Sequence, residues 1–319
     1  MRGVVLTGAA LWLSACAAGQ QGALPPAPRP ELTSVLGEYQ HDGSRLLVAE
    51  ARGRLRLYST WYIPQATQVG LRAFSSSEGA KILTLHNVVY RHRSVGPEDG
   101  GQLKITPVRP VPDLIQEALR ATPPVQPPGL RAPDLVELTT LDSTIHLDIR
   151  YATSNNFAGT VFYSQARAFL QRPAAEALVR AHHWLRQRGY GLLIHDGYRP
   201  WYVTRTFWDA MPDSARWMVA NPAEGSRHNR GSAVDLTLYD LATGRPVMMP
   251  GTYDEATRRS FPTYPGGTTR QRWYRALLRS AMVAQGFSAN PEEWWHFDYQ
   301  DWRRYPVLNV RFEDLRRGD

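Results

Sequence analysis

Short runs of alternating hydrophobic and polar residues occupy the stretch between residues 31 and 121. Turn sequences rich in Gly and Asp, such as those at 41–43 and 52–53, separate these runs. Alternation with a period of two indicates strands with one buried face, and such turns favour antiparallel hairpins. The pattern therefore predicts a small β-rich domain, an antiparallel barrel or curled sheet, with strands at residues 46–48, 55–58, 81–85 and 88–91.

Helical spacing appears in the second half of the chain. After Pro173, apolar residues recur three and four apart up to Gly189, which predicts a helix between these two residues. Further helices are predicted at 202–211 and 272–285, the second ended by Gly286. Apolar runs predict strands at residues 135–138, 145–151, 191–196 and 234–238. We therefore expect an α+β fold class, in which helices flank a mixed or antiparallel sheet.

Two stretches rich in proline divide the chain. Proline and glycine dominate residues 17–30, and a second such segment surrounds Pro-Pro-Val-Gln-Pro-Pro-Gly at 123–129. Such sequences form extended linkers with little to bury. The expected organisation is a signal peptide at 1–16, a tether at 17–30, a β-rich domain at 31–121, a linker at 122–134 and a larger domain at 135–319.

The net charge of +8 does not indicate nucleic-acid binding, because the basic residues are scattered and nearly all are arginines. We therefore expect no nucleic-acid partner. The single cysteine, Cys16, excludes an intrachain disulfide and a cysteine-based zinc site in this chain.

The N-terminus has the features of an export signal. Met1-Arg2 supplies a positive charge, and the apolar stretch 4–13 is too short to span a membrane. Leu13-Ser-Ala-Cys16 resembles the bacterial lipobox, in which the cysteine is lipidated and becomes the mature N-terminus. The resemblance implies an exported protein whose lipid at Cys16 anchors it to a membrane of the cell envelope. An ordinary signal peptide cut nearby is the alternative.

Candidate chemistry is concentrated in two segments. His228 and Asp235 are separated by six residues with a turn at Gly231, and Asp235 lies on the polar face of the expected half-buried strand. The second segment, Glu-Glu-Trp-Trp-His, contains Glu293 and His296. Two histidines and a carboxylate can hold one catalytic zinc per chain, and Glu293 is the candidate general base.

Strand parity constrains this second segment. Glu293 and His296 are three residues apart, so on one regular strand they would face opposite sides. Because Pro291 precedes them, we expect Glu293 in the turn entering a strand and His296 on the strand itself. The other seven histidines lack such a setting and are expected to have packing or surface roles.

These motifs resemble those of the D-alanyl-D-alanine dipeptidases, zinc peptidases of the VanX type. The similarity includes the sequences at 148–159 and 196–200 and extends over residues 135–315. It implies that Arg199 stabilises the oxyanion, with a structural ion pair to Asp196 as the alternative. It also implies that Asp254 binds the substrate ammonium and that Ser226 lies near the substrate, although both could be ordinary loop residues. The end of the β-rich domain, residues 103–114 followed by a helical stretch at 115–121, resembles the accessory β domain beside some serine β-lactamase-like hydrolases.

Three functions are compatible with these motifs. The first is zinc-dependent hydrolysis of D-Ala-D-Ala in peptidoglycan turnover, recycling or glycopeptide resistance. The second is a zinc D,D-carboxypeptidase or endopeptidase that acts on muropeptides. The third is a non-catalytic lipoprotein that binds the cell wall. The intact set His228, Asp235, Glu293 and His296 favours an enzyme.

Overall fold

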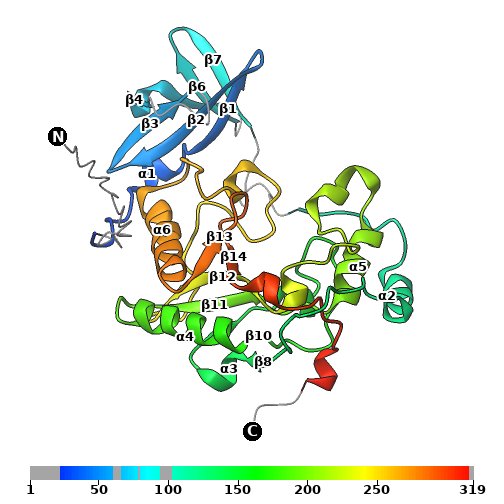
Figure 1. Ribbon diagram of the computed structural model, residues 1–319. Helices are drawn as coiled ribbons and strands as arrows, with labels where there is room; N and C mark the ends of the chain where they lie inside the picture. The colour runs from blue at the N-terminus through cyan, green and yellow to red at the C-terminus, as the bar shows by residue number, and fades with distance from the viewer. Residues whose placement is uncertain (1–21, 60–65, 78–79, 94–102, 316–319) are drawn as a thin grey trace, which may run out of the picture.

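The computed structural model describes residues 22–59, 66–77, 80–93 and 103–315. The predicted signal peptide, Cys16 and the beginning of the tether lie outside these residues. The predicted α+β class is confirmed, with an antiparallel sheet formed by the first part of the chain and a mixed sheet with helices formed by the rest (Figure 1). Within the described residues, no helix is both long and apolar enough to cross a membrane.

The β-rich domain is one seven-stranded antiparallel sheet that follows a short helix, α1 (Pro30–Thr33). Its order is β4-β3-β2-β1-β7-β6-β5, and no pairing joins β4 to β5 in the described part of the chain. The sheet is therefore open and curled rather than a closed barrel (Figure 1). The strands are β1 (Gly37–His41), β2 (Ser44–Ala51), β3 (Arg54–Tyr58), β4 (Ala66–Val69), β5 (Phe74–Ser77), β6 (Ala80–Leu85) and β7 (Val88–Arg93).

The tight turns of this sheet have the backbone that their sequences favour. Asp42 and Gly43 have φ values of 41° and 80° and join β1 to β2 as a two-residue hairpin. Arg52 and Gly53 repeat this geometry between β2 and β3, with φ values of 51° and 76°. Two positive φ values match the twist of antiparallel strands, so local sequence sets the hairpin register.

The larger domain is built on a five-stranded mixed sheet in the order β13-β14-β12-β11-β9. Only the β9–β11 pair is parallel. These strands are β9 (His146–Leu147), β11 (Tyr190–Asp196), β12 (Ala233–Asp240), β13 (Phe287–Ala289) and β14 (His296–Tyr299). A two-stranded sheet pairs β8 (Leu135–Glu137) with β10 (Phe169–Gln171). The helices are α2 (Val111–Arg120), α3 (Leu138–Leu141), α4 (Arg172–Arg186), α5 (Trp201–Ala210) and α6 (Thr269–Val283).

Two local predictions were wrong. The strand expected at 145–151 is only two residues long, because the chain turns after Leu147 into a short 3-10 helix, Arg150–Ala152. That turn directs Tyr151 into the core, where its ring lies 4.8 Å from that of Phe207. Strand β12 is buried on both faces rather than one. Its polar face is covered by the segment that carries Tyr253, whose hydroxyl donates to Asp235.

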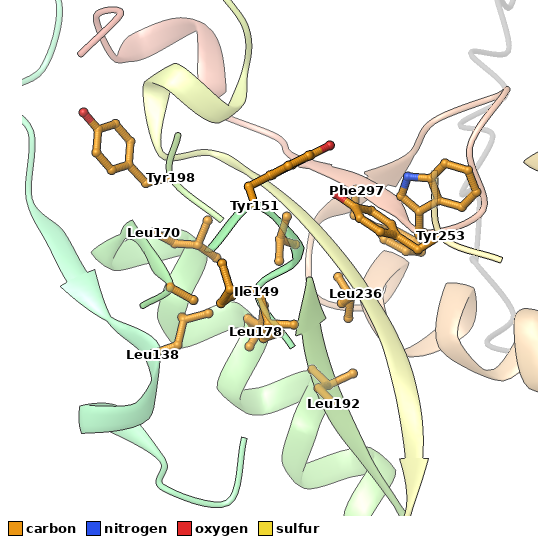
Figure 2. Close-up of a cluster of buried hydrophobic side chains, with 14 of the residues drawn as sticks. Leu138, Ile149, Tyr151, Leu170, Leu178, Leu192, Tyr198, Leu236, Tyr253 and Phe297 are labelled. Atoms are coloured by element: carbon orange, nitrogen blue, oxygen red, sulfur yellow. The ribbon is translucent and has the colours of Figure 1, made fainter. Parts of the chain in front are cut away.

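The main hydrophobic core joins helix α4 to the central strands (Figure 2). Leu178 on α4 packs into the same cluster as Leu192 of β11, Leu236 of β12 and Phe297 of β14, and all four are at most 1% exposed. Complete burial of such a side chain stabilises the fold by about 1.5–3 kcal/mol. The core therefore fixes the three strands from which the candidate site is built.

Helix α2 packs against α5 and belongs to this same core. Its buried residues Val111, Leu114 and Ala118 fall in the cluster of the larger domain rather than in that of the β sheet. The boundary expected at 122–134 stays a prediction, and α2 precedes it. We therefore expect the stability of the larger domain to depend on this helix.

Replacing Leu114 tests this dependence. Leu114 is 1% exposed, so Leu114→Ala should lower the free energy of unfolding by about 2–5 kcal/mol. Urea unfolding can be followed by tryptophan fluorescence, because eight of the ten tryptophans lie after residue 180, in the larger domain. Val125→Ala is the control, since Val125 is 97% exposed. Equal stabilities of the two variants would contradict the packing described here.

Candidate active site

Three side chains from separate segments meet at one end of the central sheet. His228 begins a 3-10 turn, His228–Arg230, which ends at Gly231 with φ 64° as the turn prediction required. Asp235 lies on β12 directly opposite His296, the first residue of β14. One ligand atom from each of the three lies within 4.8 Å of the others, and all three residues are buried. The expected ligand set is thus assembled.

Hydrogen bonds fix the orientation of both imidazoles. His228 Nδ1 lies 2.8 Å from the carbonyl oxygen of Gly197, so it carries the proton and donates. His296 Nε2 lies 3.0 Å from a carboxylate oxygen of Asp298 and donates to it. The other two nitrogens, His228 Nε2 and His296 Nδ1, face each other at 3.2 Å. In the neutral form of each ring these two nitrogens carry no proton, so both can direct a lone pair to one point, as in metal sites with an outer shell of acceptors.

The electrostatics of this point favour a cation. Burial disfavours ionisation of Asp235, yet His228 and His296 hold its pKa well below its usual range. Burial likewise opposes a charged His296, but the carboxylates of Asp235 and Asp298 raise its pKa to about 10. Positive charge placed between these groups is therefore strongly stabilised.

The donor set fits zinc. Two neutral imidazole nitrogens and one carboxylate oxygen are zinc ligands, and three protein ligands are typical of catalytic sites. Ligand atoms of a tetrahedral zinc lie about 3.3 Å apart, given zinc–ligand lengths of about 2.0–2.1 Å. The separations are 3.2 Å from His228 Nε2 to His296 Nδ1, 3.5 Å from His228 Nε2 to one Asp235 oxygen and 2.9 Å from His296 Nδ1 to the other, all close to this spacing.

Glu293 lies just before β14, so the expectation that it precedes the strand is confirmed. Its Oε2 lies 3.8 Å from His296 Nδ1 and accepts a hydrogen bond of 3.1 Å from Asn290. Burial and the neighbouring Asp235 raise the pKa of Glu293. A raised pKa suits a carboxylate that must accept a proton and later release it.

Arg199 forms the ion pair with Asp196 that the sequence offered as the alternative role. Its Nε and Nη2 donate to one oxygen of Asp196, at 3.0 and 2.8 Å, and the other oxygen accepts from Tyr163 at 2.7 Å. Burial disfavours the charge, but Asp196 holds the pKa of Arg199 well above its usual value. The guanidinium nevertheless lines the same cavity as His228 and His296. The ion pair therefore orients a permanent cation toward the site.

Ser226 and Asp254 also line this cavity. Ser226 Oγ accepts a hydrogen bond of 3.1 Å from the backbone N–H of His228, so it helps to position that ligand. Asp254 accepts a bond of 3.1 Å from the Tyr151 hydroxyl and has φ 57°. Burial, with Asp235 and Glu293 nearby, raises the pKa of Asp254 to about 8.

Three partners of the ligands were not identified from the sequence. Asp298 follows His296 by two residues, so strand parity could have placed both on one face. In the structure it also accepts a bond of 2.6 Å from Arg227. Tyr253 donates to Asp235 at 3.1 Å, and the Gly197 carbonyl orients His228. The last two contacts arise from tertiary packing and have no signature in local sequence.

Comparison with known proteins agrees with this geometry. Residues 131–315 match the peptidase M15 family model, described as D-Ala-D-Ala dipeptidase. The D-alanyl-D-alanine dipeptidase of Escherichia coli K12 is 34% identical over 56% of this chain and 91% of its own length. The proteins of the same name from Enterococcus faecium and Streptomyces coelicolor are 35% and 32% identical, over 52% and 53% of this chain and 93% and 92% of their own lengths. The chain therefore belongs to the peptidase M15 family of D-Ala-D-Ala dipeptidases, which is zinc-dependent.

Proposed function

We propose that this protein hydrolyses the dipeptide D-Ala-D-Ala, using one zinc ion held by His228, Asp235 and His296. The observation that carries the proposal is the buried convergence of these three ligands, with Glu293 beside them. Membership of the M15 family supports the reaction type and the substrate. Release of free D-alanine from D-Ala-D-Ala by the purified protein is the direct test.

Zinc bound at these ligands would activate a water molecule and polarise the scissile carbonyl group. Glu293 would take the proton of the attacking water and return it to the leaving amine. Its position 3.8 Å from His296 Nδ1 supports this role, because the carboxylate lies beside the ligands. Its raised pKa favours acceptance of the proton from the water.

Arg199 would stabilise the negative charge that develops on the carbonyl oxygen. A guanidinium keeps its charge at any working pH and presents several donors. The hydrogen bonds to Asp196 use Nε and Nη2, and Nη1 makes none among the described residues. Nη1 is therefore the donor we assign to the oxyanion.

Asp254 would bind the free ammonium of the dipeptide, and Ser226 would support the adjacent ligand loop. Burial raises the pKa of Asp254 to about 8. A bound ammonium would favour the ionised carboxylate, so substrate binding would lower this pKa. This arrangement would select substrates with a free amino end close to the scissile bond. Ser226 contributes through its hydrogen bond to the His228 backbone.

A D,D-carboxypeptidase acting on muropeptides is the second candidate function. One observation favours it: the cavity around the ligands has a volume of about 990 Å³. That is near the upper end for pockets that enclose drug-sized ligands, and a dipeptide would fill only part of it.

We further propose that the protein is exported and lipid-anchored in the cell envelope. The lipobox-like sequence before Cys16 and the tether that follows support this location. A tether of this kind would hold the catalytic domain away from the membrane surface while leaving it near peptidoglycan fragments.

Metal analysis tests the ligand assignment. After reconstitution and dialysis, the wild-type protein should retain one zinc per chain, and His296→Ala should retain almost none because one of three protein ligands is lost. His146→Ala is the matched control, since His146 is exposed, stacks on Tyr239 with ring centroids 3.8 Å apart and does not line the cavity. A wild-type protein that holds no zinc after reconstitution would refute the assignment.

A second variant pair separates catalysis from metal binding. Glu293→Gln should lower kcat for D-Ala-D-Ala by about 10²–10⁴-fold, because the general base is lost, while zinc content is unchanged. Glu292→Gln should keep near-normal turnover, since Glu292, although it lines the same cavity, is exposed and forms no hydrogen bond or salt bridge with the three ligands among the described residues. If Glu293→Gln arrives without zinc, or retains full activity, the assigned role is wrong.

Membrane anchoring has its own test. Cys16→Ser should abolish incorporation of labelled fatty acid and move the protein from the membrane fraction to the soluble fraction. Ser14→Ala, which keeps the cysteine, should still be labelled. Unchanged fractionation of Cys16→Ser would count against the lipid anchor.

A further inference from the structure

Tyr253 contacts both the metal ligands and the subsite proposed for the substrate ammonium. Its hydroxyl donates to Oδ2 of Asp235, one of the three candidate ligands, at 3.1 Å. Its ring packs against the indole of Trp295, the residue before the ligand His296, with ring centroids 5.6 Å apart. Along the backbone it directly precedes Asp254. One buried side chain, 4% exposed, therefore connects segments that are far apart in the sequence.

The hydroxyl of Tyr253 holds one oxygen of the Asp235 carboxylate. The other oxygen, Oδ1, lies 2.9 Å from His296 Nδ1. When His228 and His296 each carry the proton on the outer nitrogen, neither ring donates to Asp235, and Tyr253 remains as a donor to its carboxylate. Outer hydrogen bonds of this kind orient a ligating group, and losing one typically weakens metal binding by about 10–100-fold.

Packing fixes the ring that carries this hydroxyl. The imidazole of His195 on β11 stacks on the Tyr253 ring, with centroids 4.6 Å apart and an angle of 25° between the planes. His195 is held in turn by Asp148, whose carbonyl oxygen and carboxylate lie 3.3 and 3.4 Å from its Nδ1. Trp295 meets the Tyr253 ring at 74°, and both ring partners are at most 4% exposed. The hydroxyl therefore reaches Asp235 from a position that packing has already set.

The backbone at Asp254 is held beside the same anchor. Asp254 has φ 57°, a left-handed conformation that is costly for a residue with a side chain and persists where the surroundings fix it. Tyr253 anchors the preceding residue through its bond to Asp235. From the other side, Tyr151 donates to the Asp254 carboxylate at 3.1 Å. The orientation of the ammonium subsite is therefore tied to that of a metal ligand.

We infer that Tyr253 is a positioning residue that couples the two ends of the catalytic site. Its hydroxyl orients Asp235 for the metal, and the same bond holds the adjacent Asp254 where it can receive the ammonium of the dipeptide. Tyr253 acts through these two neighbours and contacts the reacting atoms through neither its ring nor its hydroxyl. The inference rests on the proposed function, and it predicts that one hydroxyl affects both metal affinity and recognition of the free amino end.

Zinc affinity tests the first half of the coupling. Tyr253→Phe removes the hydroxyl but keeps the stacked ring, and its zinc affinity in competition with a chelator should fall at least about 10-fold. Tyr239→Phe is the matched control, because Tyr239 lies on the same strand as Asp235, is 4% exposed and donates to the Thr144 carbonyl at 2.7 Å, outside the cavity. This control should bind zinc like the wild type. Equal affinities for all three proteins would overturn the inference.

Cobalt substitution distinguishes positioning from a purely structural role. The visible absorption bands of protein-bound Co²⁺ depend on the arrangement of its ligands. They should therefore change in Tyr253→Phe and match the wild type in Tyr239→Phe. A hydroxyl that only stabilised the fold would lower the melting temperature of the zinc-free protein and leave the cobalt spectrum and the zinc affinity unchanged. That result would overturn the positioning role.

Kinetics with zinc in excess test the link to Asp254. Tyr253→Phe should raise KM for D-Ala-D-Ala more than it lowers kcat, because the ammonium contact is made in the ground state and the transition state alike. Tyr239→Phe should leave both constants unchanged. An unchanged KM for Tyr253→Phe would overturn the coupling to Asp254.

The proposed function and this inference fail separately. A wild-type holoenzyme that releases no D-alanine from D-Ala-D-Ala would refute the dipeptidase function, while the zinc and cobalt measurements would still decide the role of Tyr253 at the metal. An active wild-type enzyme whose Tyr253→Phe variant keeps its zinc affinity and cobalt spectrum would overturn the inference alone.

Discussion

The pairing of β12 with β14 is the constraint on which the site depends, because it sets Asp235 opposite His296. Side chains alternate along a strand, so a shift of one residue would turn one ligand to the other face. The adjacent pair, Val234 and Phe297, is almost completely buried in the main core. The same shift would remove this pair from the core, so hydrophobic packing and metal ligation specify one register.

The interior that results contains several ionisable groups, and each requires a partner. An isolated buried charge costs several kcal/mol, and removing one member of a buried pair is strongly destabilising. His296 is held between Asp235 and Asp298, and Asp298 is bonded in turn to Arg227. Around Arg199, Asp196 supplies the matching charge. These outer contacts orient the reacting groups before substrate arrives, which is the condition for electrostatic stabilisation of a transition state.

The sequence could predict those features that depend on neighbouring residues, and it could not predict those that depend on residues far apart in the chain. The helical spacing of α4 and the apolar run of β11 each involve only residues close together in the sequence, so both elements were predicted closely. The position of Glu293 before β14 followed from parity and a proline. By contrast, the segment 145–151 alternates like a strand, yet packing of Tyr151 turns it after two paired residues. The Gly197 carbonyl that orients His228 is a backbone atom, and no residue type marks it.

The contribution of the β domain to the cleft, whose wall includes Glu38 and Arg45, also could not be predicted from local sequence, because it depends on the contacts of Glu50 with residues more than 200 positions away. An added domain can alter specificity only if its position relative to the reacting groups is fixed. Glu50 bonds to the N-terminus of α6, where the helix dipole favours a carboxylate. Helix α6 leads through β13 directly to β14, which begins with the ligand His296. The β domain is thus attached to the helix that leads to the strand carrying a ligand, which fixes its position relative to the site.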